Sequence, residues 1–418
     1  MNRRSFLHTT ALASAAIPLI DRSLWSSMVL RPPLSTVQSA SMWVYLWDLV
    51  DEGCDAVFGR LRDNGLTAIS LACAYHTGKF LAPHNPKRKV VFLEDGTIYF
   101  QPRPELYGRI KPRVNSLVKE GNGLDQVRRS AESFGLTSNA WVVCCHNSAL
   151  GSAYPDIACQ DVFGDTIYHS LCPSNPDVRM YLRALVQDLA SRGVERIELE
   201  AMQFQPYAHG YHHEREGIAL SVTMKFLLGL CFCRSCLERA ASAGVDAGEV
   251  WKFTRRELDL CFQNPQAENE KLRSLDDLPK EIFGPFLEWR QRVVASLAAE
   301  LMESAKGHSV ALRPLVSIDP TVRLVVGMNP MRVSEITGGI LVPGYVRDGA
   351  ALREPLRLLQ NGKEIIVGFQ VGLPESGGKG EFLDRMEAAR GLGITKFNFY
   401  NYGFIPLENL TWIKEAVS

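Results

Sequence analysis

Short apolar runs alternate with longer amphipathic stretches from residue 41 to the end of the chain. Apolar runs rich in β-branched and aromatic residues predict strands, and the amphipathic stretches between them predict helices. The eight strand candidates are residues 41–48, 66–76, 138–147, 194–202, 308–319, 338–345, 364–372 and 394–403. Strands that alternate with helices predict a parallel sheet built from right-handed crossovers.

The helix between the third and fourth strands has the clearest predicted ends. Asn175 can cap it, Pro176 suits its first turn and Gly193 suits its end. Eight such strand–helix units favour one closed α/β barrel of the (β/α)8 type, the TIM barrel, over an open doubly wound sheet. The sequence after the first strand also lacks the glycine-rich turn with which doubly wound sheets bind phosphate.

Two long insertions interrupt the alternation of strands and helices. After the second strand, Asp95 and Gly96 lie between two apolar runs and predict a hairpin turn. After the fourth strand, residues 203–307 are mostly helical, and their place in the chain puts them over the carboxyl ends of the strands. We therefore expect a barrel over residues 41–418 with this insertion, preceded by a separate segment over residues 1–40.

Side-chain alternation places two glutamates inside the predicted barrel. Ile197 and Leu199 of the fourth strand should face the helices, so Glu198 and Glu200 should point inward. Buried carboxylates are costly unless they are hydrogen-bonded, paired or functional. Glu200 lies nearer the carboxyl end, where barrel enzymes carry their active sites, and is the stronger catalytic candidate. Glu198 is a substrate-binding candidate or a buried partner.

The other strands bring further polar and aromatic side chains to the same end. Asp319 ends the fifth strand just before Pro320 and is the candidate for a second catalytic carboxylate, with a turn residue as the alternative. Arg313 can balance the charge of Glu198. The remaining substrate-binding candidates on the strands are Trp43, Tyr45, His76, His146, Asn147, Gln370, Asn398 and Tyr400.

Carboxylates, amides and aromatic rings around one cup suit a carbohydrate. Two carboxylates that flank a glycosidic bond are enough for hydrolysis, and no cofactor is required. One protonates the leaving oxygen, and the other attacks or activates water. Two alternatives remain open: a non-catalytic sugar-binding barrel, and a metal-dependent sugar isomerase or lyase that uses the histidines.

The insertion begins with a histidine-rich stretch and continues to a CxCxxC motif. Its substrate-binding candidates are His209, His212, His213 and Glu214. The motif contributes Cys231, Cys233 and Cys236, and zinc accepts cysteine and histidine ligands in fours. A structural zinc ion, a disulfide and buried free thiols remain alternatives. The chain lacks the HExxH spacing of many catalytic zinc sites.

Charge and the N-terminal residues bear on partners and location. Lys and Arg number 46, as do Asp and Glu, so no net charge favours nucleic acid. Residues 3–7, RRSFL, precede a short alanine-rich run and resemble a twin-arginine export signal. This resemblance predicts a periplasmic or extracellular location. The apolar run is too short to span a bilayer, so no membrane insertion is expected after cleavage.

Residues 171–201, LCPSNPDVRMYLRALVQDLASRGVERIELEA, resemble glycoside-hydrolase-like TIM barrels, in which such a helix start leads to a strand that ends in an acidic residue. The later HGYHHE and LCFCRSC segments resemble exported bacterial proteins of this type. The resemblance covers residues 171–236 and implies a carbohydrate substrate and a catalytic role for Glu200. The chain lacks the Asn-Glu-Pro signature of many retaining barrel enzymes, so the resemblance does not identify the second carboxylate.

Overall fold

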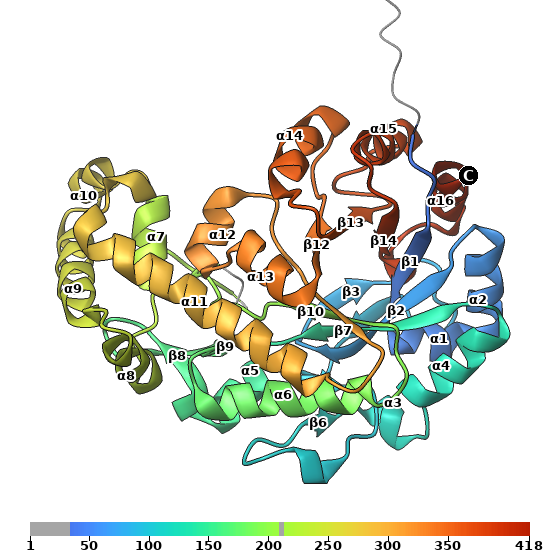
Figure 1. Cartoon of the computed structure of the whole chain (residues 1–418), viewed down its shortest axis with the longest axis horizontal. Coiled ribbons are helices and arrows are strands. Elements are labelled where there is room, and N and C mark those ends of the chain that lie inside the picture. The colour runs from blue at the N-terminus through green and yellow to red at the C-terminus, as the bar shows by residue number, and fades with distance from the viewer. Residues whose placement is uncertain (1–33, 209–212) are drawn as a thin grey trace, which may run out of the picture. The chain divides into compact units, whose positions relative to one another are not determined.

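The computed structural model describes residues 34–208 and 213–418, and the unit over residues 34–418 is built around a barrel of parallel strands (Figure 1). The barrel strands are β1 (Ser39–Val44), β2 (Ala68–Tyr75), β7 (Thr137–Val143), β10 (Arg196–Glu200), β11 (Ala311–Pro314), β12 (Gly339–Pro343), β13 (Glu364–Gln370) and β14 (Lys396–Tyr400). Their spatial order is β11-β10-β7-β2-β1-β14-β13-β12. A parallel bridge between Leu315 and Leu341 joins the two ends, which confirms the predicted (β/α)8 fold.

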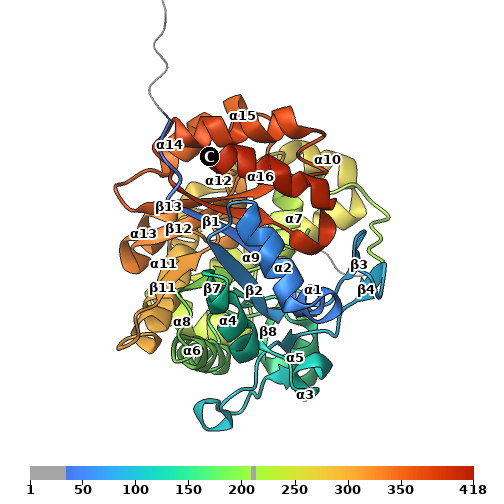
Figure 2. The ribbon, with the colours of Figure 1, turned by 90° about the vertical axis from the view of Figure 1, so that its right-hand side faces the viewer.

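Helices lie outside this barrel, most of them packed around it, while α8, α9 and α10 project to one side (Figures 1 and 2). They are α1 (Leu46–Glu52), α2 (Cys54–Asp63), α3 (Ser116–Lys119), α4 (Leu124–Ser133), α5 (Ser148–Ala153), α6 (Pro176–Ala190), α7 (Val222–Leu228), α8 (Arg234–Ser242), α9 (Ala247–Gln263), α10 (Pro265–Lys271), α11 (Lys280–Ser304), α12 (Pro320–Val326), α13 (Pro330–Thr337), α14 (Gly349–Leu359), α15 (Lys379–Arg390) and α16 (Leu410–Val417). In the part of the chain that the structure describes, no helix combines the length and the apolar character needed to cross a bilayer.

The cap of α6 forms as the sequence predicts. Asn175 Oδ1 accepts hydrogen bonds from the backbone N–H groups of Asp177 (2.9 Å) and Val178 (3.3 Å). The helix ends at Ala190, and Gly193 follows with a φ of 74°. Glycine adopts this left-handed conformation without steric cost, which lets the chain turn back into β10.

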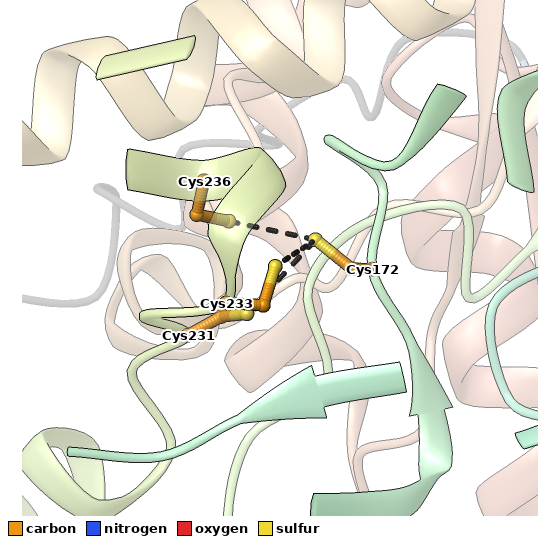
Figure 3. Close-up of side chains that lie close together, drawn as sticks. All are labelled: Cys172, Cys231, Cys233 and Cys236. Carbon is orange, nitrogen blue, oxygen red and sulfur yellow. Dashed lines mark hydrogen bonds between the residues drawn. The ribbon is translucent and has the colours of Figure 1, made fainter. Parts of the chain in front are cut away.

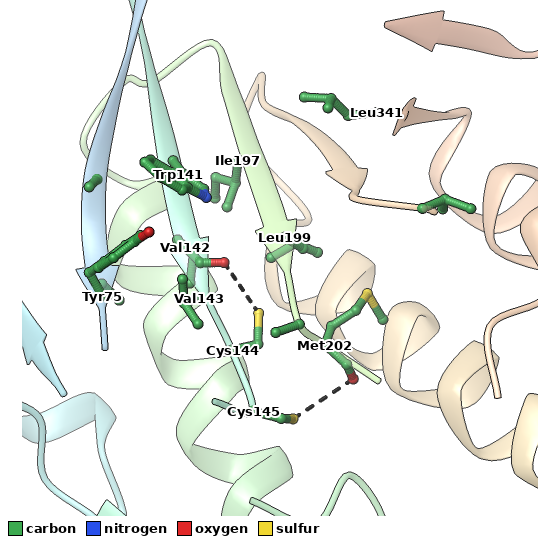
Figure 4. Close-up of a cluster of buried hydrophobic side chains, with 14 of the residues drawn as sticks. Tyr75, Trp141, Val142, Val143, Cys144, Cys145, Ile197, Leu199, Met202 and Leu341 are labelled. Atoms are coloured by element: carbon green, nitrogen blue, oxygen red, sulfur yellow. Dashed lines mark hydrogen bonds between the residues drawn. The ribbon is translucent and has the colours of Figure 1, made fainter. Parts of the chain in front are cut away.

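The core between β7, β10 and the helices is apolar (Figure 4). Ile197 and Leu199 are fully buried, and Leu199 lies opposite Val142 in the parallel register of β10 and β7. The thiols of Cys144 and Cys145 donate to the carbonyls of Val142 (3.7 Å) and Met202 (3.8 Å). This packing fixes the parity of β10, so that Glu198 points to the opposite side, into the barrel.

The hairpin predicted at Asp95 and Gly96 does not form. The strand before the turn, β4 (Val90–Phe92), pairs with β3 (Lys79–Leu81), and the strand after it, β5 (Thr97–Ile98), pairs with β2 and with β6 (Arg113–Val114). A different hairpin, β8 (Ala158–Gln160) with β9 (Thr166–Leu171), precedes α6. Tertiary pairing therefore overrides the local turn signal at this position.

Between β10 and β11 the chain forms α7, α8, α9, α10 and α11. The 25-residue α11 contacts α9 at one side and α6 and α13 at the other, so it links these helices to the outer layer of the barrel (Figure 1). Pro285 lies within α11. The predicted segment over residues 1–40 falls largely outside the described residues and stays a prediction.

Candidate active site

A layer of polar side chains fills the inside of the barrel around Glu198, which is fully buried. Its carboxylate accepts hydrogen bonds from the indole N–H of Trp43 (2.7 Å), from Ser70 Oγ (2.8 Å) and from Asn398 Nδ2 (2.7 Å). The guanidinium of Arg196 donates two more, at 2.8 and 3.0 Å. A buried carboxylate satisfied in this way is a structural group, so the geometry favours a supporting role for Glu198, Trp43 and Asn398 over contact with a substrate.

Arg313 pairs with a different carboxylate from the one expected. Its Nε donates to Glu364 Oε1 at 2.7 Å, and its Nη1 donates to the carbonyls of Leu312 and Thr337. Glu364 is the first residue of β13, so this pair lies toward the amino ends of the strands, away from the mouth of the barrel. Arg196 lies two residues before Glu198 on the same strand. Its guanidinium provides the positive charge that the sequence predicts from Arg313.

Glu200 occupies the carboxyl end of β10 and is only partly buried. Its Oε2 accepts a hydrogen bond from the indole N–H of Trp141 at 2.6 Å. Burial raises the pKa of Glu200 to about 7, the bond from Trp141 opposes this, and the charge of Glu198 raises it further. A carboxyl group with this pKa exchanges protons near neutral pH, as a general acid or base requires.

Several tyrosines lie in this part of the barrel, and the charge of Glu200 acts on Tyr75 and Tyr400. The hydroxyls of Tyr45 and Tyr400 lie 3.4 Å apart, and the ring of Tyr75 lies 4.9 Å from the ring of Trp141. Burial raises the pKa of Tyr400 to about 12, and the charge of Glu200 acts in the same direction. Burial, followed by the charges of Tyr400 and Glu200, also raises the pKa of Tyr75. These hydroxyls therefore stay protonated near neutral pH and can donate hydrogen bonds at the mouth.

Sequence reasoning chose some aromatic residues correctly as inward-facing and missed others. Tyr45 is fully buried and its ring stacks on Trp47 at 4.2 Å, so it packs inside the barrel instead of exposing a face to a substrate. Trp141 and Tyr75 were not among the candidates. Strand alternation predicts the direction of Trp141, because Trp141 and Asn139 lie on the same side of β7. Asn139 makes hydrogen bonds inside the barrel.

A second carboxylate comes from the loop after β13. Glu375 is partly buried, and its Oε2 has no hydrogen-bond partner among the described residues. Burial raises the pKa of Glu375, and the charge of Arg385 opposes the shift. The carbonyl of Gln370, at the end of β13, accepts hydrogen bonds from Ser376 Oγ (2.9 Å) and from Arg385 (3.2 Å). These bonds hold the loop that carries Glu375.

Tyr345 follows β12 and lies beside Tyr400, with 6.3 Å between the two rings. Its pKa is raised well above the usual range, first by burial and then by the charges of Tyr400, Glu200, Glu375 and Glu198. The residue as a whole is 36% exposed, so it also offers an aromatic face to solvent.

Two predicted site residues serve as helix caps instead. Asp319 is exposed, and its Oδ1 accepts from the backbone N–H groups of Thr321 (2.7 Å) and Val322 (3.3 Å) at the start of α12. Asn147 Oδ1 accepts from the N–H of Leu150 at 2.9 Å at the start of α5. The geometry thus favours the turn interpretation of Asp319.

Two predicted histidines, His76 and His146, form a row of rings with His169, which was not predicted. His76 stacks on Tyr75 with 4.4 Å between ring centroids and on His146 with 4.3 Å, and His146 lies 5.7 Å from His169. His169 and Glu214 both line a cavity of about 240 Å³. This row extends from the tyrosines around Glu200 to a hollow beside the insertion.

The metal-dependent alternative receives no support from these histidines. Face-to-face stacking of His76 and His146, with 21° between the ring planes, does not aim their nitrogens at one ion. His213 is exposed and has a φ of 57°. His209 and His212 lie outside the described residues.

The described residues contain a single group of three or more cysteine, histidine or acidic side chains that could hold a metal ion, and it consists of four cysteines (Figure 3). Cys231, Cys233 and Cys236 of the predicted motif are all in it. The fourth member is Cys172, from the LCPSNP segment before α6, which sequence reasoning did not select. All four are buried and none forms a disulfide.

No protein-family model and no curated protein sequence matches this chain. Solved structures do resemble it. The glycoside hydrolase domain of PgaB (BpsB) from Bordetella bronchiseptica aligns with a TM-score of 0.57 at 11% identity, over 92% of this chain and 99% of that one. A β-galactosidase from the psychrophilic Marinomonas ef1 aligns with a TM-score of 0.55 at 10% identity, over 91% of this chain and 59% of that one. A β-galactosidase from the Antarctic haloarchaeon Halorubrum lacusprofundi gives 0.53 at 11% identity, over 91% and 57%. The chain therefore has a barrel fold similar to that of these glycoside hydrolases.

Proposed function

We propose that this protein is a carbohydrate-active enzyme, a glycoside hydrolase in which Glu200 is the general acid. The observation that carries the proposal is the state of Glu200. It lies at the mouth of the barrel, is held by Trp141 and has a pKa of about 7. Barrel enzymes place their chemistry at this end of the strands, and a glycosidase acid requires a raised pKa. The similarity of the fold to three glycoside hydrolases supports the same class.

Glu375 takes the role of the second carboxylate in this proposal. It lies in the loop after the carboxyl end of β13, and its Oε2 is buried without a partner among the described residues. Asp319 is committed to the cap of α12. Tyr345, which follows β12, is 36% exposed, and an aromatic side chain can pack against a sugar ring.

The chemistry follows from these positions. Protonated Glu200 gives its proton to the glycosidic oxygen as the bond to the anomeric carbon breaks. Glu375 either attacks that carbon or removes a proton from the water that does so. Tyrosine hydroxyls around Glu200 remain protonated and can hold sugar hydroxyls. No step needs a metal or an organic cofactor.

The test is a screen of the full-length protein against aryl glycosides and glycans, with and without a chelator. On any substrate that turns over, Glu200→Gln and Glu375→Gln should each lower kcat by about a hundredfold or more. Asp319→Asn is the matched control and should keep kcat. If Glu375 is a nucleophile, azide should rescue Glu375→Ala, because alanine leaves room for the anion to attack the anomeric carbon. Turnover by Glu200→Gln at the wild-type rate would refute the assignment, and sugar binding without turnover would favour a binding barrel.

We further propose that the chain is exported. Residues 3–7 carry the paired arginines, the aromatic residue and the leucine of a twin-arginine signal, and they lie outside the described residues. A periplasmic or extracellular location suits an enzyme that degrades a polysaccharide.

A further inference from the structure

Four thiols from two distant parts of the chain meet beside the barrel (Figure 3). Cys172 lies between β9 and α6, while Cys231, Cys233 and Cys236 lie at the start of α8, about sixty residues later. The four Sγ atoms all lie within 4.8 Å of one another. Cys172 Sγ is 3.4 Å from Cys236, 3.6 Å from Cys233 and 3.9 Å from Cys231.

These separations match a tetrahedral metal site. Zinc–sulfur bonds of about 2.3 Å in a tetrahedron hold the four sulfurs about 3.8 Å apart. A disulfide would bring two sulfurs to about 2 Å and would draw them away from the others. Cys172 is instead near three thiols at once, and a disulfide can satisfy it with only one. Four free thiols are the alternative, and metal analysis of the purified protein distinguishes the two.

We propose that Cys172, Cys231, Cys233 and Cys236 bind one zinc ion in a closed, structural site. Four thiolates fill the tetrahedral positions around the ion. No position is left open for water or substrate, so the ion has no part in the chemistry at Glu200. Cys233 occupies the N-cap position of α8 and Cys236 lies in its first turn, where the helix amino end favours thiolates.

The site would fasten the helical insertion to the barrel. Cys172 directly follows β9 and precedes α6, which packs on the barrel and on α11. The other three ligands belong to the segment that leads into α8 and α9. One ion therefore ties two loops together, close to the β8–β9 hairpin, because the N–H of Phe232 donates to the carbonyl of Gln160 at 2.7 Å. Cys159, next to Gln160, accepts from Ser170 Oγ at 3.3 Å and lies outside the group of four.

The test measures metal in the purified full-length protein. Elemental analysis should find about one zinc ion per chain. After exchange, Co²⁺ should give the intense thiolate charge-transfer and visible bands of a tetrahedral sulfur site. Cys172→Ser should lose most of the bound metal. Cys261→Ser removes a buried thiol of α9 that is not in the group and should retain it.

Metal analysis of the wild-type protein alone can refute the proposal, so the test does not depend on whether a variant folds. Protein produced with ample zinc that contains none, with its four thiols free or joined in disulfides by thiol titration, would refute it. Iron in place of zinc, or octahedral cobalt bands, would refute the assigned ion or ligand set. Strong chelation should lower the melting temperature of the wild type and leave that of Cys172→Ser unchanged.

Discussion

Replacing Glu200 with glutamine should make the protein more stable at alkaline pH while it removes the proposed activity. Glutamine keeps the shape of the side chain, and its carbonyl can still accept the hydrogen bond from Trp141. It is neutral at every pH. The substitution therefore isolates the free energy of holding a carboxylate charge in a poorly solvated site.

The size of the effect follows from the pKa. The folded protein binds a proton at Glu200 up to a pH of about 7, whereas the unfolded chain releases it near 4.5. Stability from this proton is thus complete below 4.5 and is lost as the pH rises to about 7. At about 1.36 kcal/mol per pH unit, the loss is about 3 kcal/mol. Because Glu200 is only partly buried, solvent reduces this figure, and we expect about 1–3 kcal/mol above neutral pH.

Glu198 gives the matched contrast. Glu198→Gln leaves Arg196 buried without its counter-charge, and breaking a buried pair in this way costs about 3–5 kcal/mol. The two substitutions are chemically identical and lie two residues apart on β10, yet they should change stability in opposite directions.

The assay is denaturant unfolding of the wild type and both variants at about pH 5 and about pH 8, with midpoints compared at constant slope. Glu200→Gln should raise the midpoint at the higher pH and change it little at the lower one. If Glu200→Gln destabilised the protein equally at both pH values, the carboxylate would be well solvated. Its pKa would then not be raised, and the reasoning would be wrong.

Three further results are expected. Trp141→Phe removes the hydrogen bond that lowers the pKa of Glu200, so the alkaline limb of the pH–rate profile should move to higher pH, and an unchanged profile would contradict this. Asp319→Ala should cost about 1 kcal/mol of stability in thermal unfolding by loss of a helix cap, with kcat retained; a large fall in kcat would restore Asp319 as the catalytic partner. Replacing Arg3 and Arg4 with lysine should keep the protein in the cytoplasm on cell fractionation, and undiminished export would refute the signal.

The sequence by itself determined the barrel and the direction of the side chains on its strands. Alternation in β10 was enough to place Glu198 inside the barrel and Ile197 in the apolar layer, because a strand has a fixed period of two. The cap at Asn175 was equally local, since its partners are two and three residues away. Patterns of this kind are readable because each depends only on neighbours along the chain.

Only the tertiary structure decided which distant groups meet. The turn at Asp95 was overridden because both flanking strands found longer-range partners. Arg196 pairs with Glu198 in place of Arg313, because strand pairing does not determine which carboxylate a long side chain reaches. Cys172 joined three cysteines about sixty residues away because α6 and the insertion pack together. Glu375, which we propose as the second carboxylate, lies on a loop, where no periodicity of the sequence predicts the direction of a side chain. These contacts depend on how the closed barrel brings its loops together, and local sequence patterns do not predict that arrangement.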